Sequence, residues 1–451
     1  MERHSVSDIR AAIEAGFPAV RHELEQLVRY PSVSADPAAA SAVDESAEAV
    51  AELARGAGAA DVQVLSVPGG KPAVVAHWPA PEGAPTVLLY AHHDVQPPGP
   101  AEEWASEPFE PAERDGRLYG RGAADDKAGV LAHIAALRAF DGRPPVGVTL
   151  FVEGEEEIGS PTFSTFLQTY RDALRADVIV VADSVNWSTQ TPAFTTSLRG
   201  LVDCVVEVRV LEHAVHSGMY GGPVVDALTS LCRLLGSLHD ADGDVAVPGL
   251  RVGTVADVDY PVERYRAEAS VLDGVQLSGT GTLAERLWVK PAISVVGIDA
   301  PTVAGSANVL VHEARAKISM RLAPGQDPRV ALDALREHLQ HHAEFGAQVT
   351  VVDGAVASPS VMDTTSAAFA AATDAFTEAF GEDPVRMGMG GSIPFIAELE
   401  RAFPQATVLV TGVEDPDSRA HGVNENLHLG QFATVCLAEA LLLQRLAGIT
   451  E

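Results

Sequence analysis

Cysteine is scarce in this sequence. Only Cys204, Cys232 and Cys436 occur among its 451 residues, far apart and each inside an apolar run. This number and spacing exclude a disulfide framework and a zinc site built from CxxC motifs. We therefore expect three buried, reduced thiols in a protein from a reducing compartment.

Basic residues are also few. The chain has 31 Lys and Arg against 62 Asp and Glu, which gives a formal net charge of −31. This charge disfavours binding to nucleic acid and to anionic membrane surfaces. Part of the acidic excess is available for binding metal ions.

Long apolar runs are missing as well. No apolar stretch approaches the roughly 18 residues that a membrane-spanning helix needs. The N-terminal segment has neither the basic region nor the apolar region of a secretory signal peptide. From these features we expect a soluble, cytoplasmic protein.

The length of the chain and the pattern of its expected strands and helices predict two domains. A chain of 451 residues that is 47% hydrophobic can bury a large core. Strands alternate with helices up to residue 199 and again from residue 356, which indicates parallel βαβ units. Residues 200–355 have longer strands. We predict an α/β fold whose first domain (1–199 and 356–451) has a mixed, mostly parallel sheet flanked by helices, with an inserted α+β domain at 200–355.

Ionisable residues gather at the end of a predicted central strand. The apolar run Thr86–Tyr90 is typical of a buried strand, and His92, His93 and Asp94 follow it. Because side chains alternate along a strand, His92 and Asp94 share a face while His93 points away. A histidine beside a carboxylate is a common pairing of a metal ligand with its orienting group. By itself, however, His-x-Asp is a weak signal.

Acidic residues follow two more predicted strands. Glu155–Glu157 come after a strand at 147–152, and Asp183 comes after the next one. If these strands are parallel, their ends meet His92 at the edge where open α/β sheets bind ligands. Asp125, in a turn between glycines and an apolar helix, is a further candidate for this edge.

These residue types favour a pair of divalent metal ions. Two adjacent ions need five or six oxygen and nitrogen ligands, with one carboxylate shared between them. Ligands of His, Asp and Glu without Cys suit a hydrolytic dizinc site better than a structural one. Such a site also needs a free carboxylate as general base, and adjacent glutamates at a strand end could divide these two tasks.

The sequence resembles the dizinc peptidase and deacylase family that contains carnosinase-type dipeptidases, aminoacylases, acetylornithine deacetylase and succinyl-diaminopimelate desuccinylase. The matching segments, in family order over nearly the whole chain, are YAHHDV, GRGAADDK, EGEEEIGS, ADS, HSGMYGG, ISMRLAP, GGSIPF and AHGVNE. Each segment is moderately specific, and together they are strong evidence. HSGMYGG and GGSIPF are more similar to the carnosinase-type dipeptidases than to the deacetylases.

The resemblance implies how the metal ligands are divided. His92 and Asp183 would bind one metal, and Asp94 would orient His92. Asp125 would bridge both metals, and a cis peptide bond would follow it. The ions would be two divalent metals per subunit: zinc by resemblance, with manganese or cobalt as alternatives because His and carboxylate sites tolerate all three.

The remaining ligands and the base come from two other motifs. The resemblance implies that Glu157 and His421 complete the second metal site and that Glu156 is the general base. Because three glutamates are adjacent, this assignment depends on the alignment to Gly154 and Gly159.

Four further residues would act on the substrate. By resemblance, His216 would stabilise the oxyanion in the active site of the partner subunit of a homodimer. Arg321 would clamp the terminal carboxylate of the substrate, while Ser392 and Asn308 would form hydrogen bonds to it. The inserted domain would serve as a lid and dimerisation domain.

The resemblance predicts a metal-dependent amide hydrolase that acts on dipeptides or short peptides. The alternative within the family is an N-acyl amino acid deacylase, and the sequence does not distinguish the two. A third hypothesis is a binding protein on an inactive hydrolase fold. The complete ligand set and Glu156 argue against it.

Overall fold

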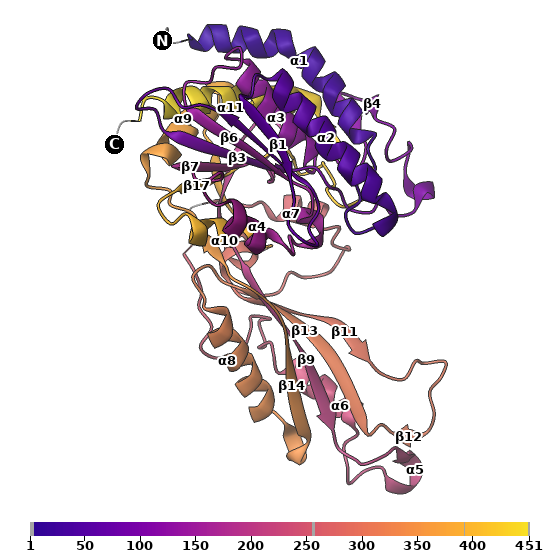
Figure 1. The fold of residues 1–451 in the computed structure, drawn as a ribbon. Helices are drawn as coiled ribbons and strands as arrows, with labels where there is room; N and C mark the ends of the chain where they lie inside the picture. The colour runs from indigo at the N-terminus through magenta and orange to yellow at the C-terminus, as the bar shows by residue number, and fades with distance from the viewer. Residues whose placement is uncertain (1–3, 255–257, 392, 450–451) are drawn as a thin grey trace. The chain divides into compact units, whose positions relative to one another are not determined.

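The chain forms two compact units in the computed structural model, which describes residues 4–254, 258–391 and 393–449. The first unit comprises Met1–Thr196, Met362–Arg386 and Glu398–Glu451, and the second comprises Ser197–Val361 and Met387–Ala397. Figure 1 shows a sheet flanked by helices in each unit. The predicted α/β class with a mostly parallel central sheet is confirmed. The role of residues 200–355 as a lid and dimerisation domain stays a prediction.

A six-stranded sheet forms the centre of the first unit, in the order β1-β2-β6-β3-β7-β17. Its strands are β1 (Asp61–Leu65), β2 (Ala73–Trp78), β3 (Thr86–His92), β6 (Gly147–Glu153), β7 (Val178–Val181) and β17 (Thr407–Val410). Strands β6, β3, β7 and β17 are parallel to one another, whereas β1 and β2 pair antiparallel. The carboxyl ends of four strands therefore meet at one edge of the sheet.

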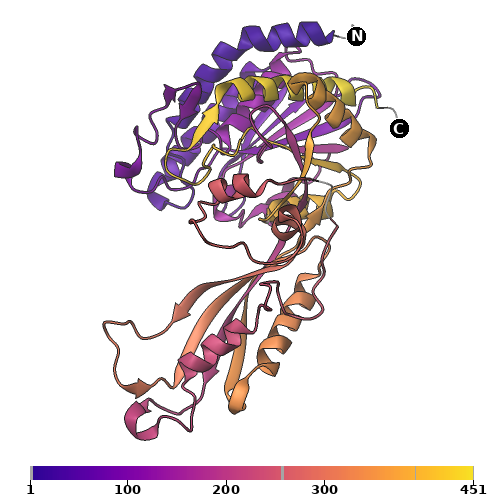
Figure 2. The same cartoon turned by 180° about the vertical axis from the view of Figure 1, so that it is seen from behind.

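Helices cover both faces of this sheet. One face carries α1 (Val6–Val28), α2 (Ala40–Gly56), α3 (Lys127–Arg138), α9 (Ala367–Phe380) and α11 (Leu429–Leu446). Figures 1 and 2 both show α1 and α11 on this side. The other face carries α4 (Phe163–Tyr170), whose Phe163 and Phe166 stack on Phe151 of β6. The sheet is thus buried on both sides, which explains why its strands are continuously apolar.

Helix α11 has the length and mean hydropathy of a membrane span, although the sequence was expected to contain no such stretch. Of this helix, 72% is buried inside the structure, where it packs against α1, α3 and α9. It also carries Glu439, which forms a buried ion pair with His133 of α3. This packing identifies α11 as a core helix of the first unit.

An antiparallel sheet forms the centre of the second unit, in the order β11-β13-β9-β14. Its strands are β9 (Gly200–Arg209), β11 (Ala292–Asp299), β13 (Glu313–Leu322) and β14 (Gln348–Ala357). Helices α6 (Ala227–Gly236) and α8 (Pro328–His341) pack against it. A short ribbon pairs β10 (Val215–His216) with β12 (Val309–Leu310), and α5 (Ser217–Tyr220) follows β10.

The remaining elements are short. In the first unit, β4 (Ala112–Arg114), β5 (Arg117–Tyr119) and β18 (Asn426–His428) form a small sheet. Helix α7 (Val262–Glu268) belongs to the second unit. Close to the points where the chain passes between units lie β8 (Ala193–Leu198), β15 (Ser360–Val361), β16 (Val385–Met389) and α10 (Pro394–Ala402).

The expectation of three buried thiols is wrong for Cys232, which is exposed, whereas Cys204 and Cys436 are buried. In α6, Leu231 and Leu234 face the core of the second unit. A helix turns about 100° per residue, so the position after Leu231 points away from that core. Apolar neighbours in sequence do not by themselves show which side of a helix is buried.

Lys127 joins the start of α3 to the end of α1. Its buried ammonium group donates hydrogen bonds to the carbonyl oxygens of Leu27, at 2.9 Å, and Tyr30, at 2.7 Å. Burial lowers the pKa of Lys127 to about 7. These carbonyls lie at the C-terminal end of α1, where a cation is favourable. Lys127 therefore fixes α1 against the turn that carries Asp125.

We expect Lys127→Met to lower the free energy of unfolding by about 2 kcal/mol, because both carbonyl oxygens lose their hydrogen-bond donor in the interior. Denaturant unfolding of the full-length protein measures this change. The matched control is Lys71→Met, at a half-buried surface lysine, which should unfold like the wild type. Equal midpoints for the two variants would contradict the role given to Lys127.

Candidate active site and metal centre

The site begins at the end of β3. Tyr90 lies on the face of the sheet that carries α4, because its ring contacts Phe151 of β6, on which α4 stacks. His92 and Asp94 follow Tyr90 at alternate positions, whereas His93 has the parity of the opposite face. The His92 Nδ1 atom lies 3.1 Å from the Asp94 carbonyl oxygen and 3.4 Å from Asp94 Oδ1. Asp94 thus leaves His92 Nε2 to face the site. The expected division of His92 and Asp94 from His93 agrees with this geometry.

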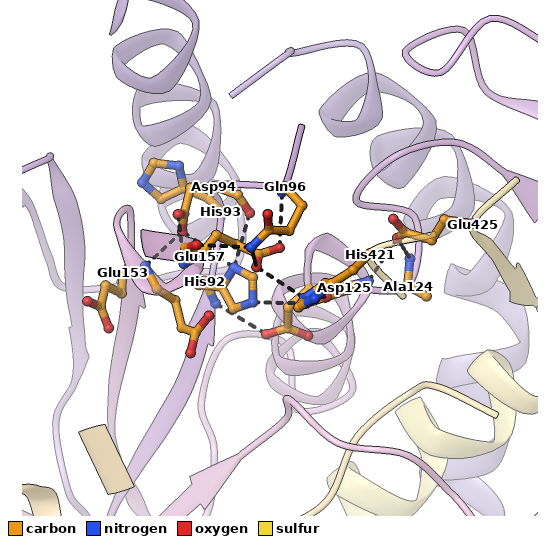
Figure 3. A network of polar contacts seen from close by, with 12 residues as sticks. His92, His93, Asp94, Gln96, Ala124, Asp125, Glu153, Glu157, His421 and Glu425 are labelled. Atoms are coloured by element: carbon orange, nitrogen blue, oxygen red, sulfur yellow. Dashed lines mark hydrogen bonds and ion pairs between the residues drawn. The ribbon is translucent and has the colours of Figure 1, made fainter. Parts of the chain in front are cut away.

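Asp94 also positions the acidic segment after β6. Its two carboxylate oxygens accept hydrogen bonds from the backbone N–H of Glu156, at 3.2 Å, and of Glu157, at 3.1 Å. The Asp94 pKa lies below its usual value, because the hydrogen bond and charge of His92 outweigh burial. One carboxylate therefore fixes both His92 and the backbone that carries the two glutamates (Figure 3).

Asp125 lies between two histidines. Its Oδ1 atom is 3.1 Å from His92 Nε2, and its Oδ2 atom is 3.0 Å from His421 Nε2. The peptide bond between Asp125 and Asp126 is cis, as the resemblance implied. Because each oxygen faces a different histidine, the carboxylate has the arrangement of a bridge between two ions (Figure 3).

Glu425 and Arg121 hold the backbone of Asp125 in place. The Glu425 Oε1 atom accepts hydrogen bonds from the N–H groups of Ala124, at 3.0 Å, and Asp125, at 3.1 Å. Its Oε2 atom accepts a hydrogen bond from Arg121 Nη1 at 2.6 Å, and both side chains are buried. Arg121 also donates to the carbonyl oxygens of His421 and Gly422. The same ion pair therefore fixes Asp125 and the loop that carries His421.

Glu157 and His421 form the second half of the site. His421 Nε2 lies 3.1 Å from Glu157 Oε2, and Gln96 donates to the same glutamate from its backbone N–H, at 3.1 Å, and its side chain, at 2.8 Å. The hydrogen bonds to Asp125 and Glu157 raise the pKa of His421 to about 11. His421 thus sits where two carboxylates attract a positive charge.

Carboxylates crowd the other half of the site. The ligand atoms of His92, Glu156 and Asp183 lie within 4.8 Å of one another, and those of Asp125, Asp183 and Glu414 form a second such group. Burial and the neighbouring Asp125 raise the pKa of Asp183 to about 7. Burial, and next the charge of Asp183, raise the pKa of Glu156 well above its usual value.

This donor set fits divalent ions. Histidine nitrogens and carboxylate oxygens in one buried cluster are ligands for zinc, manganese or cobalt, and repulsion among the carboxylates is what cations relieve. The groups that could hold an ion contain His, Asp and Glu and no Cys. In the described part of the chain, the chemistry is therefore that of a hydrolytic rather than a structural metal site.

The first unit brings together the residues predicted at the metal centre. These are His92, Asp94, Asp125, Glu156, Glu157, Asp183 and His421. His216, Asn308 and Arg321 belong to the second unit. Ser392 lies outside the described residues. The catalytic and ligand roles of all these residues stay predictions.

Neighbouring polar residues have other partners. His93 Nε2 lies 2.9 Å from the carbonyl oxygen of Pro72, and burial lowers its pKa to about 4. Asp126 accepts a hydrogen bond from the backbone N–H of His92 at 3.2 Å. The carboxylate of Glu155 accepts from the N–H groups of Lys71 and Thr162 and from the Thr162 hydroxyl. Glu155 thus has a structural role. This leaves Glu156 and Glu157 for the roles of base and metal ligand that the resemblance implies.

Glu414 is the residue that sequence reasoning missed. It lies beyond the end of β17, as Asp183 lies beyond β7, and these strands pair in parallel. Burial, and then the charges of Asp125 and Asp183, raise the pKa of Glu414 well above its usual value. The sequence does carry a signal for it, because the β-branched apolar run Ala406–Val410 is typical of a strand and Glu414 follows that run.

Comparison with known proteins agrees with this fold and site. Residues 88–445 match the profile of peptidase family M20/M25/M40. The cysteinylglycine-S-conjugate dipeptidase of Corynebacterium striatum is 35% identical over 364 residues, which are 79% of this chain and 80% of that protein. The Beta-Ala-His dipeptidase of Rattus norvegicus is 31% identical over 82% of this chain and 78% of its own.

Among solved structures, the dipeptidase Dug1p of Saccharomyces cerevisiae matches with a TM-score of 0.80 and 25% identity, over the full length of both chains. The resemblance to carnosinase-type dipeptidases is thereby confirmed. The chain belongs to peptidase family M20/M25/M40.

Proposed function

We propose that this protein is a metal-dependent hydrolase that cleaves the amide bond of dipeptides, with Glu156 as general base. The observation that carries the proposal is the placement of Asp125, whose two oxygens face His92 and His421 at 3.1 and 3.0 Å. Relatives in peptidase family M20/M25/M40 that are named as dipeptidases support the choice of substrate. They favour it over the alternative, an N-acyl amino acid deacylase.

The proposed metal ligands fall into two sets that share Asp125. His92 and Asp183 would hold one divalent ion, and Glu157 and His421 would hold the other. When bound, such ions polarise a scissile carbonyl and lower the pKa of water. We propose zinc in both positions, because His, Asp and Glu ligands without Cys are the set expected of a hydrolytic dizinc site.

Glu156 is suited to move a proton. Its backbone is fixed by the hydrogen bond to Asp94, while its side chain lies in the group with His92 and Asp183. As general base it would accept a proton from the attacking water and pass it to the leaving nitrogen.

Arg321 is proposed to bind the terminal carboxylate of the substrate. It lies on β13 beside the buried Arg199, whose pKa burial and Arg321 lower to about 10. Two neighbouring guanidinium groups attract a carboxylate, and Arg binds it in a bidentate manner. Ser392 and Asn308 are proposed as further hydrogen-bond donors to the substrate.

We also propose that the protein is a cytoplasmic homodimer with the second unit as its lid and dimerisation domain. Edge strand β11 exposes Val295, Val296 and Ile298, which suits contact with a second copy. His216 is exposed at the start of α5, where its Nδ1 atom accepts a hydrogen bond from the Gly218 N–H. Because Nδ1 accepts this hydrogen bond, Nε2 carries the ring proton and would stabilise the oxyanion in the partner's site.

Replacing Glu156 tests its role as general base. We expect Glu156→Gln to bind both metals like the wild type and to lose turnover by a factor of about 10²–10⁴, because the amide cannot accept the proton. Glu155→Gln is the matched control one residue away. It should keep turnover and unfold more easily, because Glu155 holds Lys71 and Thr162. Substantial turnover by Glu156→Gln would exclude it as the base.

Subunit mixing tests the action of His216 across the dimer. Neither His216→Ala nor Glu156→Gln homodimers should be active. Heterodimers of the two variants would contain one site with both an intact base and an intact partner histidine. We therefore expect activity to return on mixing, to at most about a quarter of the wild-type value when subunits exchange freely. No recovery, although native mass spectrometry detects heterodimers, would rule out a shared site.

A substrate mixture tests the proposed reaction. Metal-loaded enzyme is incubated with a free dipeptide, its N-acetylated form, a free tripeptide and an N-acetyl amino acid, and mass spectrometry follows each compound. We expect the free dipeptide to disappear first, and a chelator to prevent this because the ligands lose their ions. Preferential loss of the N-acetyl amino acid would identify a deacylase instead.

A further inference from the structure

Glu414 is held rigidly beside Asp183. Its backbone pairs with Val185, and its carbonyl oxygen accepts hydrogen bonds from the Asn186 N–H, at 2.9 Å, and the Gln431 side chain, at 3.0 Å. A Cβ atom at Gly412 would lie only 1.8 Å from the Ser184 carbonyl oxygen. Only glycine permits this close approach, so the loop that carries Glu414 is seated directly on the loop that carries Asp183.

The carboxylate of Glu414 is unpaired within the part of the chain that the structure describes. Among the described residues, no hydrogen bond or ion pair reaches its oxygens, although the side chain is mostly buried. Nearby glutamates differ, because Glu153 accepts from the Tyr90 hydroxyl and Glu425 pairs with Arg121. Two other acidic side chains at the site share this state, Glu156 and Asp183, and each has a proposed role. Glu414 is the one left to explain.

The group around Glu414 differs in chemistry from the rest of the site. Glu414 clusters with Asp125 and Asp183 without a histidine, whereas the other two candidate groups contain His92. Asp125 and Asp183 already belong to the proposed metal ligands. An additional carboxylate beside them provides negative charge and acceptors for a further, compact cation. An ammonium group, with three N–H donors, meets that description.

We propose that Glu414 binds the free α-ammonium group of the dipeptide and so selects unblocked dipeptides over N-acyl amino acids. This inference rests on the proposed function. The amine nitrogen of a dipeptide lies about 2.5 Å from the scissile carbonyl carbon, since one Cα separates them. A residue that recognises the amine must therefore lie at the margin of the metal-binding groups. Glu414 lies there, within 4.8 Å of two of them.

The same geometry explains discrimination against the alternative substrates. An N-acyl amino acid has an alkyl group where the dipeptide has its ammonium group. Binding it would leave the Glu414 carboxylate buried without a donor, which is costly. A single carboxylate at this position thus separates a dipeptidase from a deacylase while the metal ligands stay the same.

The test compares two substrates that differ only in the amine. One is an alanyl dipeptide that the wild type hydrolyses. The other is the N-propionyl amino acid in which a hydrogen atom replaces the amine of that alanyl residue. We expect Glu414→Gln to lose about 10- to 100-fold in kcat/KM on the dipeptide, because a charge-assisted hydrogen bond is removed. Hydrolysis of the propionyl compound should stay near the wild-type value. The matched control is Asp417→Asn, at an exposed carboxylate of the same loop, which should change neither.

Two further measurements do not depend on turnover. The metal content of Glu414→Gln should equal that of the wild type. In calorimetry, the dipeptide should bind Glu156→Gln more tightly than the double variant by the same 10- to 100-fold. Equal losses of kcat/KM on both substrates would overturn the assignment. Loss of metal from Glu414→Gln would also overturn it, because it would identify Glu414 as a metal ligand. A wild-type enzyme that cleaves no dipeptide would instead refute the proposed function itself.

Discussion

Repulsion among carboxylates is the constraint on which the first unit depends. Asp125, Glu156, Asp183 and Glu414 converge at the carboxyl edge of one sheet, and burial raises the pKa of three of them. Such a cluster stores unfavourable energy that divalent cations release. The surrounding fold must therefore hold these groups together against the repulsion between their charges.

The holding contacts are made by acidic residues of a second kind. Asp94 is bound to His92 and to two backbone N–H groups, Glu425 to Arg121 and the backbone of Asp125, and Glu155 to Lys71 and Thr162. These carboxylates hold the backbone and side chains of the site in place. Protein donors satisfy these three carboxylates, whereas among the described residues no hydrogen bond or ion pair reaches the side-chain oxygens of Glu156, Asp183 or Glu414.

Much of this was predictable because it follows from local rules. Alternation along β3 placed His92 and Asp94 on one face and His93 on the other, and parallel pairing brought Glu157 and Asp183 to one edge. The sequence could not show which hydrogen-bond partners each carboxylate has. Glu155 and Glu156 are identical in type and adjacent, and only the contacts to Thr162 and Asp94 distinguish them. The prediction that Cys232 is buried was wrong for a similar reason, because neighbouring positions on a helix can face opposite environments.

Glu414 shows why the last part of a site is the hardest to foresee. Its position depends on β17 pairing with β7 across more than 220 residues of chain, and on a glycine that lets two backbones nearly touch. Neither feature has a local pattern. The proposed metal ligands come from recognisable motifs, whereas a residue that recognises the substrate can come from any loop that reaches the same edge. Specificity within this family can thus change by substitution at such loops without disturbing the metal centre.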